Sequence, residues 1–348
     1  MANVSLNTAK AAKNDEFYTQ LSDIENELRH YKEHFRGKTV LCNCDDPRVS
    51  NFFKYFALNF EHLGLKRLIT TCYKNQDIDL FSKHDCEQAV YLIYDGDKNG
   101  NHVPDPEEIG IHPLKGDGDF RSKECIDLLK QADIVVTNPP FSLFREYIAQ
   151  LMDFDKKFLV IGNKNAITYR EVFPLIMQDR MWVGCTPMSR EIYFDVPQDF
   201  IDDALKKGKD RTIVMHHGKH MARSQSIWFT NLDIPKRHEN IILYKQYSSK
   251  EYSHYDNYNA IEVSKTSDIP DKYYEVMGVP ITFLDKYNPD QFEILGITDK
   301  GNVDGLKTKE ANEAIESLKI PGFPKYDRPY INGVRKYARI LIRRKQKQ

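Results

Sequence analysis

The sequence predicts an α/β fold, with a doubly wound, Rossmann-like sheet in its amino-terminal part and a β-rich region after it. Short apolar runs alternate with amphipathic, helix-like stretches through the first half of the chain, which is typical of strands joined by crossover helices. The apolar run 134–137 opens onto a turn, and open α/β sheets bind ligands at such strand ends. The second half lacks the alternation and has short β-rich pieces, 227–230 and 241–244, between polar loops.

The first helix is predicted between residues 21 and 35. Ser22 and Glu25 have the spacing of a capping box, and Gly37 would end the helix. The run 39–44 then predicts a short apolar strand. The apolar residues on one helical face are Leu21, Ile24, Leu28, Tyr31 and Phe35.

A stripe of large apolar residues predicts the next helix, which Gly64 would end. We interpret the stripe as core, because apolar residues at helical spacing usually face the interior. The runs 68–72 and 157–161 predict two further strands. The stripe consists of Val49, Phe52, Phe53, Phe56, Phe60 and Leu63.

The turn Asn138-Pro139-Pro140-Phe141 separates the strand 134–137 from a helix-like stretch, 143–154. Two consecutive prolines fix the backbone and remove two N–H donors, so the carbonyl of Pro139 meets little local competition. Asn138 supplies a second carbonyl acceptor, and Phe141 a flat apolar face. Two acceptors beside a ring suit a planar NH₂ group on a flat molecule, such as N6 of adenine.

The reactivity of such an amine explains why two acceptors are needed. Its lone pair is delocalised into the base, so the nitrogen is a poor nucleophile. Two acceptors that hold its hydrogens pull the nitrogen toward a tetrahedral shape and stabilise the positive charge that develops during attack. The electrophile would be the sulfonium methyl of S-adenosylmethionine. The alternative interpretation is a Pro-Pro turn that only starts a helix.

Asn-Pro-Pro-Phe after such a strand resembles the catalytic motif of adenine-N6 DNA methyltransferases, and the wider sequence resembles the EcoRI-type adenine-specific family. The resemblance covers nearly the whole chain and implies the methyltransferase version of the sheet, with one antiparallel strand near the edge. It also makes GAATTC the first target sequence to test. The segments that carry it are 15–20, 42–56, 137–146, 162–168 and 276–280.

The resemblance implies a cofactor site beside the catalytic turn. Phe17, Tyr18 and Thr19 resemble the family's amino-terminal cofactor motif, which often reads Phe-Tyr-Thr-Pro, with Gln20 in place of the proline here. Asp117 and Asp119 resemble the acid that holds the adenine amine of the cofactor, and Phe120 would pack against that ring. A solvated turn is the alternative for this segment.

The loop after the strand 39–44 is a further part of the expected cofactor site. It contains Asn43, Asp45 and Asp46 where methyltransferases usually carry a glycine-rich turn. Its carboxylates suit the amino group of the cofactor's methionine, and the following helix amides suit the carboxylate. An Asx-rich helix cap is the alternative. The segment 71–73 after the next strand offers no acid for the ribose.

Two patterns that resemble metal sites have other interpretations. Asp95, Asp97, Asn99 and Gly100 begin like a calcium loop, but Pro106 occupies the position of the required glutamate; a hairpin or insertion turn fits better. His216, His217 and His220 have no carboxylate cluster beside them, so DNA contact or a solvated loop is favoured over metal binding. We therefore expect no metal site.

Candidate DNA contacts come from two basic segments in the latter half of the chain. Arginine and glutamine can read guanine and adenine edges with paired hydrogen bonds. The stretch 335–345 is expected to be a basic strand suited to phosphate contacts, with a solvated edge strand as the alternative. The candidate residues are Arg211, Lys219, Arg223 and Gln225 in the first segment, and Arg343 and Arg344 in the second.

Composition limits the remaining possibilities. The net charge is −1, so DNA binding requires that basic residues gather on one face. Six irregularly placed cysteines suggest reduced thiols. No apolar run is long enough to cross a membrane and no signal peptide is evident, so we expect a cytoplasmic protein with no obligate protein partner. We expect a catalytic domain at 1–195 and a recognition region at 196–348.

The predicted function is methylation of adenine N6 in double-stranded DNA, with the target base flipped out and S-adenosylmethionine as methyl donor. Two alternatives remain open. The same turn can serve methylation of RNA bases or of protein glutamine amides, and the fold can persist in a DNA-binding protein without catalysis. The arginine-containing latter half favours DNA, and the intact turn favours an enzyme.

Overall fold

The computed structural model describes residues 18–44, 50–71, 89–101, 104, 108–196, 198–206, 208, 213–216, 218–298 and 328–346. The chain forms two compact units. The first comprises Met1–Lys164 and Gly184–Leu232, and the second Asn165–Val183 and Asp233–Gln348. The first unit therefore keeps residues 198–232, which we assigned to the recognition region. The functional division at residue 195 stays a prediction.

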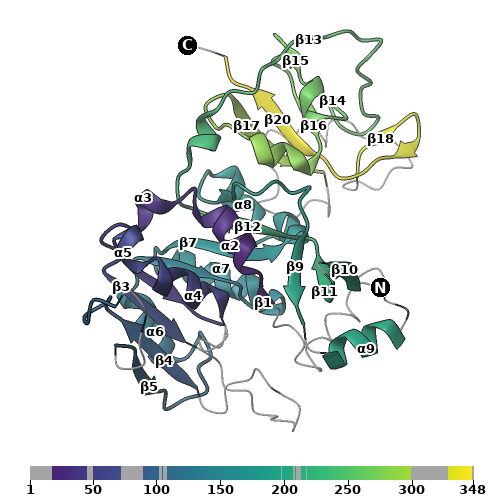
Figure 1. Cartoon of the computed structure of the whole chain (residues 1–348). Helices are drawn as coiled ribbons and strands as arrows, with labels where there is room; N and C mark the ends of the chain where they lie inside the picture. The colour runs from purple at the N-terminus through teal and green to yellow at the C-terminus, as the bar shows by residue number, and fades with distance from the viewer. Residues whose placement is uncertain are drawn as a thin grey trace. The chain divides into compact units, whose positions relative to one another are not determined.

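Among the described residues, seven strands of the first unit form one large mixed sheet (Figure 1). The neighbours β3–β2, β2–β6 and β6–β7 are parallel, whereas β4, β5 and β12 pair antiparallel with β3, β4 and β7. The expectation of a single antiparallel strand was wrong, because such strands lie on both sides of the parallel centre. The order across the sheet is β5 (Gly110–Pro113), β4 (Val90–Tyr94), β3 (Arg67–Thr71), β2 (Thr39–Cys42), β6 (Ile134–Thr137), β7 (Lys157–Asn163) and β12 (Ser226–Thr230).

Helices cover both faces of this sheet, as expected for a doubly wound fold. Phe52 of α4 packs edge-on against Trp228, and Phe144 of α7 packs against the next residue, Phe229. Successive side chains of a strand point to opposite faces, so α4 and α7 lie on opposite sides. The helices with bounds in this unit are α2 (Leu21–Leu28), α3 (Lys32–Phe35), α4 (Asn51–Leu58), α5 (Phe60–Leu63), α6 (Lys123–Gln131), η1 (Phe141–Leu143), α7 (Phe144–Asp153) and α9 (Gln198–Lys206).

The two amino-terminal helical predictions are confirmed in position, but each helix is divided. The first breaks into α2 and α3 and begins after Gln20, so Ser22 and Glu25 do not form the expected capping box. The second breaks at Asn59, and Ser50 caps its first part by accepting hydrogen bonds from Phe52 and Phe53. Gly64 ends it in the left-handed conformation, φ +61°. Phe52, Phe56, Phe60 and Leu63 are buried, which confirms the core interpretation.

A second, antiparallel sheet of the first unit brings the amino terminus of the described chain beside later strands. Its order is β1–β9–β11–β10, and α9 contacts both β10 and β11. One row across it joins Thr19, Phe194, Ala222 and Ile213. Cross-strand neighbours share a face, so these four side chains point the same way. The strands are β1 (Tyr18–Thr19), β9 (Ile192–Asp195), β11 (Lys219–Ser224) and β10 (Ile213–His216).

The second unit is built from short strands, as the sequence predicted for the latter part of the chain. Its largest sheet has the order β14–β16–β20–β17. The basic strand β20 is therefore internal, and the edge-strand alternative was wrong. Its elements are α8 (Phe173–Met177), β8 (Trp182–Val183), η3 (Pro235–His238), β13 (Lys245–Gln246), β14 (Ile261–Glu262), η4 (Thr266–Asp268), β15 (Pro270–Asp271), β16 (Met277–Val279), η5 (Ile281–Lys286), β17 (Phe292–Ile297), β18 (Tyr330–Ile331), β19 (Val334–Arg335) and β20 (Ile340–Arg344); η2 (Lys164–Thr168) precedes them.

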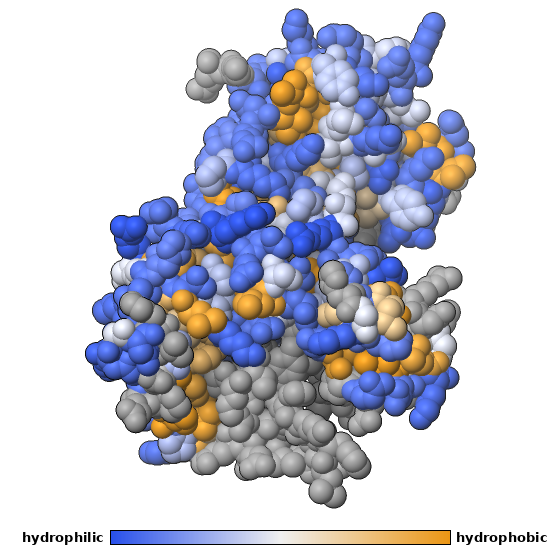
Figure 2. Space-filling view, in the orientation of Figure 1, coloured by the Kyte–Doolittle hydropathy of each residue, from blue (hydrophilic) through white to orange (hydrophobic). Residues whose placement is uncertain are grey.

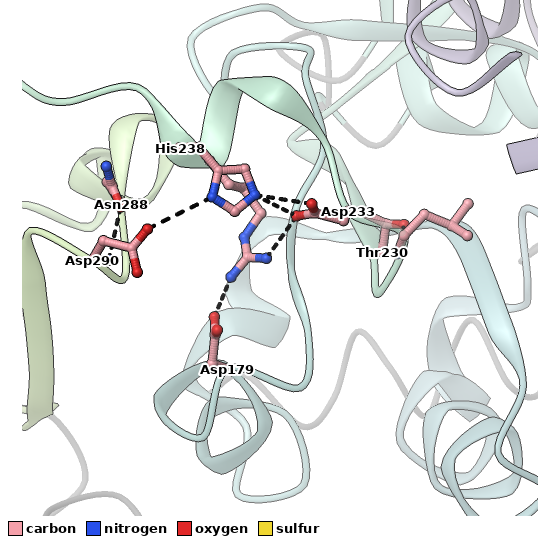
Figure 3. A network of polar contacts seen from close by, with 8 residues as sticks. Asp179, Thr230, Asp233, His238, Asn288 and Asp290 are labelled. Atoms are coloured by element: carbon pink, nitrogen blue, oxygen red, sulfur yellow. Dashed lines mark hydrogen bonds and ion pairs between the residues drawn. The ribbon is translucent and has the colours of Figure 1, made fainter. Parts of the chain in front are cut away.

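A buried arginine of this unit is held by acids closer to the surface. The Arg237 guanidinium stacks 3.6 Å from the ring centre of Trp182 and pairs with Asp179 and with Asp233, the latter at 3.2 Å. Figure 3 shows how His238 continues this network from Asp233 to Asp290. A buried charge needs such compensation, and the two acids supply it to Arg237.

The segment 241–244 was predicted as a strand, and that prediction was wrong. It has no strand pairing, and the side chains of Ile242 and Tyr244 are 85% and 65% exposed. The apolar residues of this run therefore do not contribute to a sheet among the described residues. In the part of the chain that the structure describes, no helix has the length and apolarity needed to span a bilayer.

Candidate active site

Two parallel strands end side by side where the winding of the main sheet reverses. The chain goes from β2 through α4 and α5 to β3, and from β6 through α7 to β7, which lie on opposite sides of the β2–β6 pair. Leu41 is in register with Val135, so the segments after Cys42 and Thr137 emerge at one edge. Such a switch point is where open α/β sheets bind ligands, and Asn43 and Asn138 follow these two strands.

The turn Asn138–Phe141, which the sequence predicts to be catalytic, lies at this switch point. Asn138 and Pro139 are buried, with Asn138 7% exposed, whereas Pro140 and Phe141 are half-buried. The Pro140 carbonyl accepts a hydrogen bond from Leu143 N at 3.0 Å, which starts η1 and then α7. The Phe141 ring meets the buried Phe194 ring nearly edge-on, with centroids 6.4 Å apart. Part of the Phe141 ring thus remains accessible to a ligand.

Asn43 is held by β6 and by α7, the helix that follows it. The Thr137 hydroxyl donates to the Asn43 main-chain carbonyl, and the Tyr147 hydroxyl of α7 donates to Asn43 Oδ1. Thr137, Asn43 and Tyr147 are all buried. Burial raises the pKa of Tyr147 well above its usual value, so this hydroxyl keeps its proton and stays a donor.

The segment Asp117–Phe120 contacts Tyr147 through Phe120. The Phe120 ring is buried and lies edge-on against the Tyr147 ring, with centroids 5.0 Å apart. Asp119 accepts hydrogen bonds from the Arg121 side chain, which holds the pKa of this carboxyl below its usual value. Asp119 is thus committed to an internal ion pair. Asp117 accepts one hydrogen bond, from Asp119 N at 3.1 Å, and is the carboxylate better placed to take a ligand.

Thr19 lies close to the turn Asn138–Phe141 through the second sheet. It is opposite Phe194, whose ring meets Phe141. Thr19 is 2% exposed, and its hydroxyl has no hydrogen-bond partner among the described residues, while its carbonyl accepts from Asn51 Nδ2 at 2.8 Å. Buried hydroxyls without partners are rare. The predicted cofactor residues Phe17, Asp45 and Asp46 lie outside the described residues, as does the Tyr18 side chain.

The family model of the adenine-specific methyltransferase EcoRI matches residues 5–345 of the chain. The chain belongs to this family. It is an adenine-specific DNA methyltransferase.

Three curated relatives match almost end to end. The chain is 46% identical to the Type II methyltransferase M.EcoRI of Escherichia coli over 348 residues, which cover 99% of this chain and 98% of that protein. It is 39% identical to M.MgeORF184P of Mycoplasma genitalium and 36% identical to M.MpnI of Mycoplasma pneumoniae, each over 98% of both chains. No solved structure matches the chain. The resemblance inferred from the sequence is thereby confirmed.

The candidate DNA contacts of this family member fall in both units. Lys219 and Arg223 lie in β11 and are exposed, and Gln225 is exposed just after it. Arg223 lies 3.4 Å from Glu191, and Gln225 accepts a hydrogen bond from Lys164 N through its main-chain carbonyl. Arg211 lies outside the described residues.

The other two candidates, Arg343 and Arg344, are in β20 of the second unit. Arg343 pairs with Glu293, and Arg344 with Asp271 at 2.6 Å. Both line a groove of about 870 Å³ that also contains Tyr274, Glu275, Asp290, Glu293, Lys345 and Gln346. The groove mixes acids with bases, so its charge is less positive than the sequence of β20 suggests.

Some residues of the two patterns that resembled metal sites have other partners in the structure. Asp97 accepts a hydrogen bond from Gly100 N at 2.7 Å and so closes a turn, while Asp95 pairs with Arg67. His216 stacks on Tyr193 with centroids 3.9 Å apart. The described residues contain no cluster of three metal-ligating side chains. His102 and His217 are not among them.

Sequence reasoning missed Tyr147 and Phe194. Tyr147 lies on the apolar face of α7 with Phe144, Ile148 and Leu151, so it resembles any core residue. Its contact with Asn43 spans 104 positions. Phe194 sits in a short strand with ordinary alternation. Only tertiary packing distinguishes either residue.

Proposed function

We propose that the chain transfers the methyl group of S-adenosylmethionine to N6 of an adenine in double-stranded DNA, with the target base turned out of the duplex toward Asn138. The observation that carries this proposal is the position of Asn138–Phe141 at the switch point, beside Asn43. A base stacked inside a duplex cannot reach a buried asparagine, so it must leave the stack, at a cost of a few kcal/mol.

Each member of the turn has a role in this proposal. The Asn138 side-chain carbonyl and the Pro139 carbonyl accept the two N6 hydrogens and stabilise the charge on nitrogen during transfer. Pro139 and Pro140 withhold competing N–H donors. Phe141 offers the accessible part of its ring to the extruded base, and stacking offsets part of the cost of extrusion.

The residues around this turn fit S-adenosylmethionine, which supplies a methyl group on a positively charged sulfur. The hydroxyl of Thr19 is buried without a described partner, as expected of a group that a ligand completes. Asn43 and Phe120 both contact Tyr147, and Asp117 precedes Phe120 in the same loop. We assign Asn43 and Thr19 to polar contacts, Asp117 to an amino group and Phe120 to the adenine ring of the cofactor, with Asp119 as support for its loop. Phe17, Tyr18, Asp45 and Asp46 remain candidates.

DNA contact is assigned to exposed residues at β11 and to β20. Lys219, Arg343 and Arg344 suit phosphates, and Arg211, Arg223 and Gln225 suit base edges. GAATTC is the first sequence to test, as the resemblance to the EcoRI-type family implies. We expect the enzyme to work in the cytoplasm, without an obligate protein partner.

The experiment that tests this function offers three acceptors to the purified chain. Radiolabelled S-adenosylmethionine is incubated with duplex DNA, with RNA of the same sequence and with a mixed protein extract. Label in DNA alone supports the proposal. Label in RNA or protein assigns the turn to another planar NH₂ group, and absence of label from all three contradicts transfer by this chain.

A further inference from the structure

Asn43 is fixed at two points, and both contacts come from the catalytic segment 137–147. Thr137, next to Asn138, donates its hydroxyl hydrogen to the Asn43 main-chain carbonyl. Tyr147 donates to the side-chain oxygen Oδ1. Two donors at separate oxygens leave neither the main chain nor the side chain of Asn43 free to turn.

The direction of the Asn43 amide follows from its partner. Tyr147 is fully buried, and Asn43 is its hydrogen-bond acceptor among the described residues. If the amide were reversed, the Tyr147 hydroxyl hydrogen would be left without that acceptor, which is costly inside a protein. Oδ1 therefore faces Tyr147, and the NH₂ group points away from it.

Among the described residues no acceptor faces the Asn43 NH₂ group, and this nitrogen is not one of the fully enclosed polar atoms that lack a partner. It is therefore open to a ligand, and a ligand oxygen at the switch point would accept its hydrogen.

We propose that Tyr147 is a positioning residue that turns the Asn43 amide so that its NH₂ group donates a hydrogen bond to an oxygen of the bound cofactor, either its carboxylate or a ribose hydroxyl. This inference rests on the proposed function. It makes the cofactor contact at β2 depend on α7, the helix that begins at the catalytic turn. Tyr147 itself touches neither cofactor nor base.

The test is calorimetric titration of S-adenosylmethionine into the full-length parent and five variants. Tyr147→Phe keeps the ring against Phe120 and removes only the donor. Asn43→Asp keeps an acceptor for Tyr147 but replaces the NH₂ group. Asn43→Ala and the double variant Tyr147→Phe/Asn43→Ala complete a cycle. Tyr31→Phe is the matched control, because Tyr31 is equally buried and donates to Glu27 at 2.8 Å outside the site.

We expect Tyr147→Phe to weaken cofactor binding about 10-fold and Asn43→Asp at least as much, because a hydrogen bond to a ligand loses its donor. The double variant should bind no more weakly than Asn43→Ala, since Tyr147 acts through Asn43. Tyr31→Phe should bind like the parent. Parental affinity in Tyr147→Phe, or losses that multiply in the double variant, would overturn the inference.

Folding is checked by circular dichroism and the unfolding midpoint. If Tyr147→Phe fails to fold, Asn43→Asp decides, and parental affinity in that variant contradicts a donating NH₂ group. Repeating the titration with decarboxylated S-adenosylmethionine identifies the acceptor. A Tyr147→Phe effect that disappears assigns the cofactor carboxylate, and one that persists assigns a ribose hydroxyl. A parent chain that binds no cofactor contradicts the proposed function itself; a parent that binds beside an unaffected Tyr147→Phe contradicts only this inference.

Discussion

Asn138 is the residue on which the proposed chemistry depends most. Asn138→Ala removes one N6 acceptor and leaves the cofactor residues and β11 unchanged. We expect methyl transfer to fall at least about 10²-fold while DNA binding persists, since one preorganised group typically contributes that much. Single-turnover transfer and duplex binding are measured side by side. Asn59→Ala, at an asparagine of the same unit whose side chain donates to Tyr55 O at 2.8 Å, is the control. Parental turnover in Asn138→Ala would remove this side chain from the mechanism.

Phe141 tests whether the extruded base needs an aromatic neighbour. Phe141→Ala should weaken capture of the base, whereas Phe141→Trp should retain part of the activity because a flat face remains. A fluorescent adenine analogue at the target position reports extrusion. Phe53→Ala, at a half-buried phenylalanine of α4, controls for loss of a ring elsewhere. If both Phe141 variants transfer as fast as the parent, stacking by this residue is unnecessary.

Some residues of the candidate site could be predicted from their neighbours in the sequence, and others could not. Asn138–Phe141 could be predicted, because a strand, two prolines and a helix start define the turn within a few positions. The arrangement of Thr137, Asn43 and Tyr147 could not, because its hydrogen bonds join residues 94 and 104 positions apart. Asp119 was predicted as a cofactor ligand, but the sequence does not show that Arg121 folds back onto it.

Strand β20 carries the candidate phosphate contacts Arg343 and Arg344. Replacing both with glutamine should weaken binding equally on all DNA sequences and reduce the salt dependence, by about 1 in slope for each phosphate that is no longer neutralised. Binding to cognate and scrambled duplexes is measured across a salt series, with the unfolding midpoint alongside. Unchanged slopes with a lower midpoint would show that the pairs with Glu293 and Asp271 are purely structural.

Strand β11 carries Arg223, our first choice for a base-reading residue. Arg223→Ala should cost roughly 1–3 kcal/mol on the cognate site and little on a scrambled one. The comparison uses the same two duplexes at one salt concentration. Arg190→Ala, an exposed arginine of the same unit paired with Asp23 at 3.5 Å, should change neither affinity. Equal losses on both duplexes would make Arg223 a phosphate contact instead.

At the level of elements, periodicity predicted well which segments are helices or strands and in what order they follow one another. It predicted poorly where each strand lies in its sheet. The apolar stripes located the amino-terminal helices and the parallel strands. The run 241–244 resembles a strand in composition, yet it has no neighbour to pair with, and pairing decides whether β-prone residues form a strand. The same limit explains β20, whose internal position depends on β16 and β17.

The charge of the whole molecule constrains how it meets DNA. Fifty basic and 51 acidic residues leave a net charge of −1. Figure 2 shows one face, on which hydrophilic residues cover most of the described surface and hydrophobic residues form separate patches. Such a chain binds a polyanion only where cations gather locally. Arg223, Arg343 and Arg344 are each paired with an acid. To bind a DNA phosphate, each arginine must therefore exchange its carboxylate partner for the phosphate.

The central claim is that this chain methylates adenine at N6 in DNA, and the identity of the product tests it most directly. Duplexes that contain GAATTC or a scrambled site are incubated with the chain and S-adenosylmethionine, digested to nucleosides and analysed by mass spectrometry. We predict N6-methyldeoxyadenosine from the GAATTC duplex. The cytosine N4 amine is also planar and suits two acceptors, so its product is measured too. Methylated cytosine in place of methylated adenine, or unmodified DNA from a chain that binds the cofactor and both duplexes, would contradict the claim.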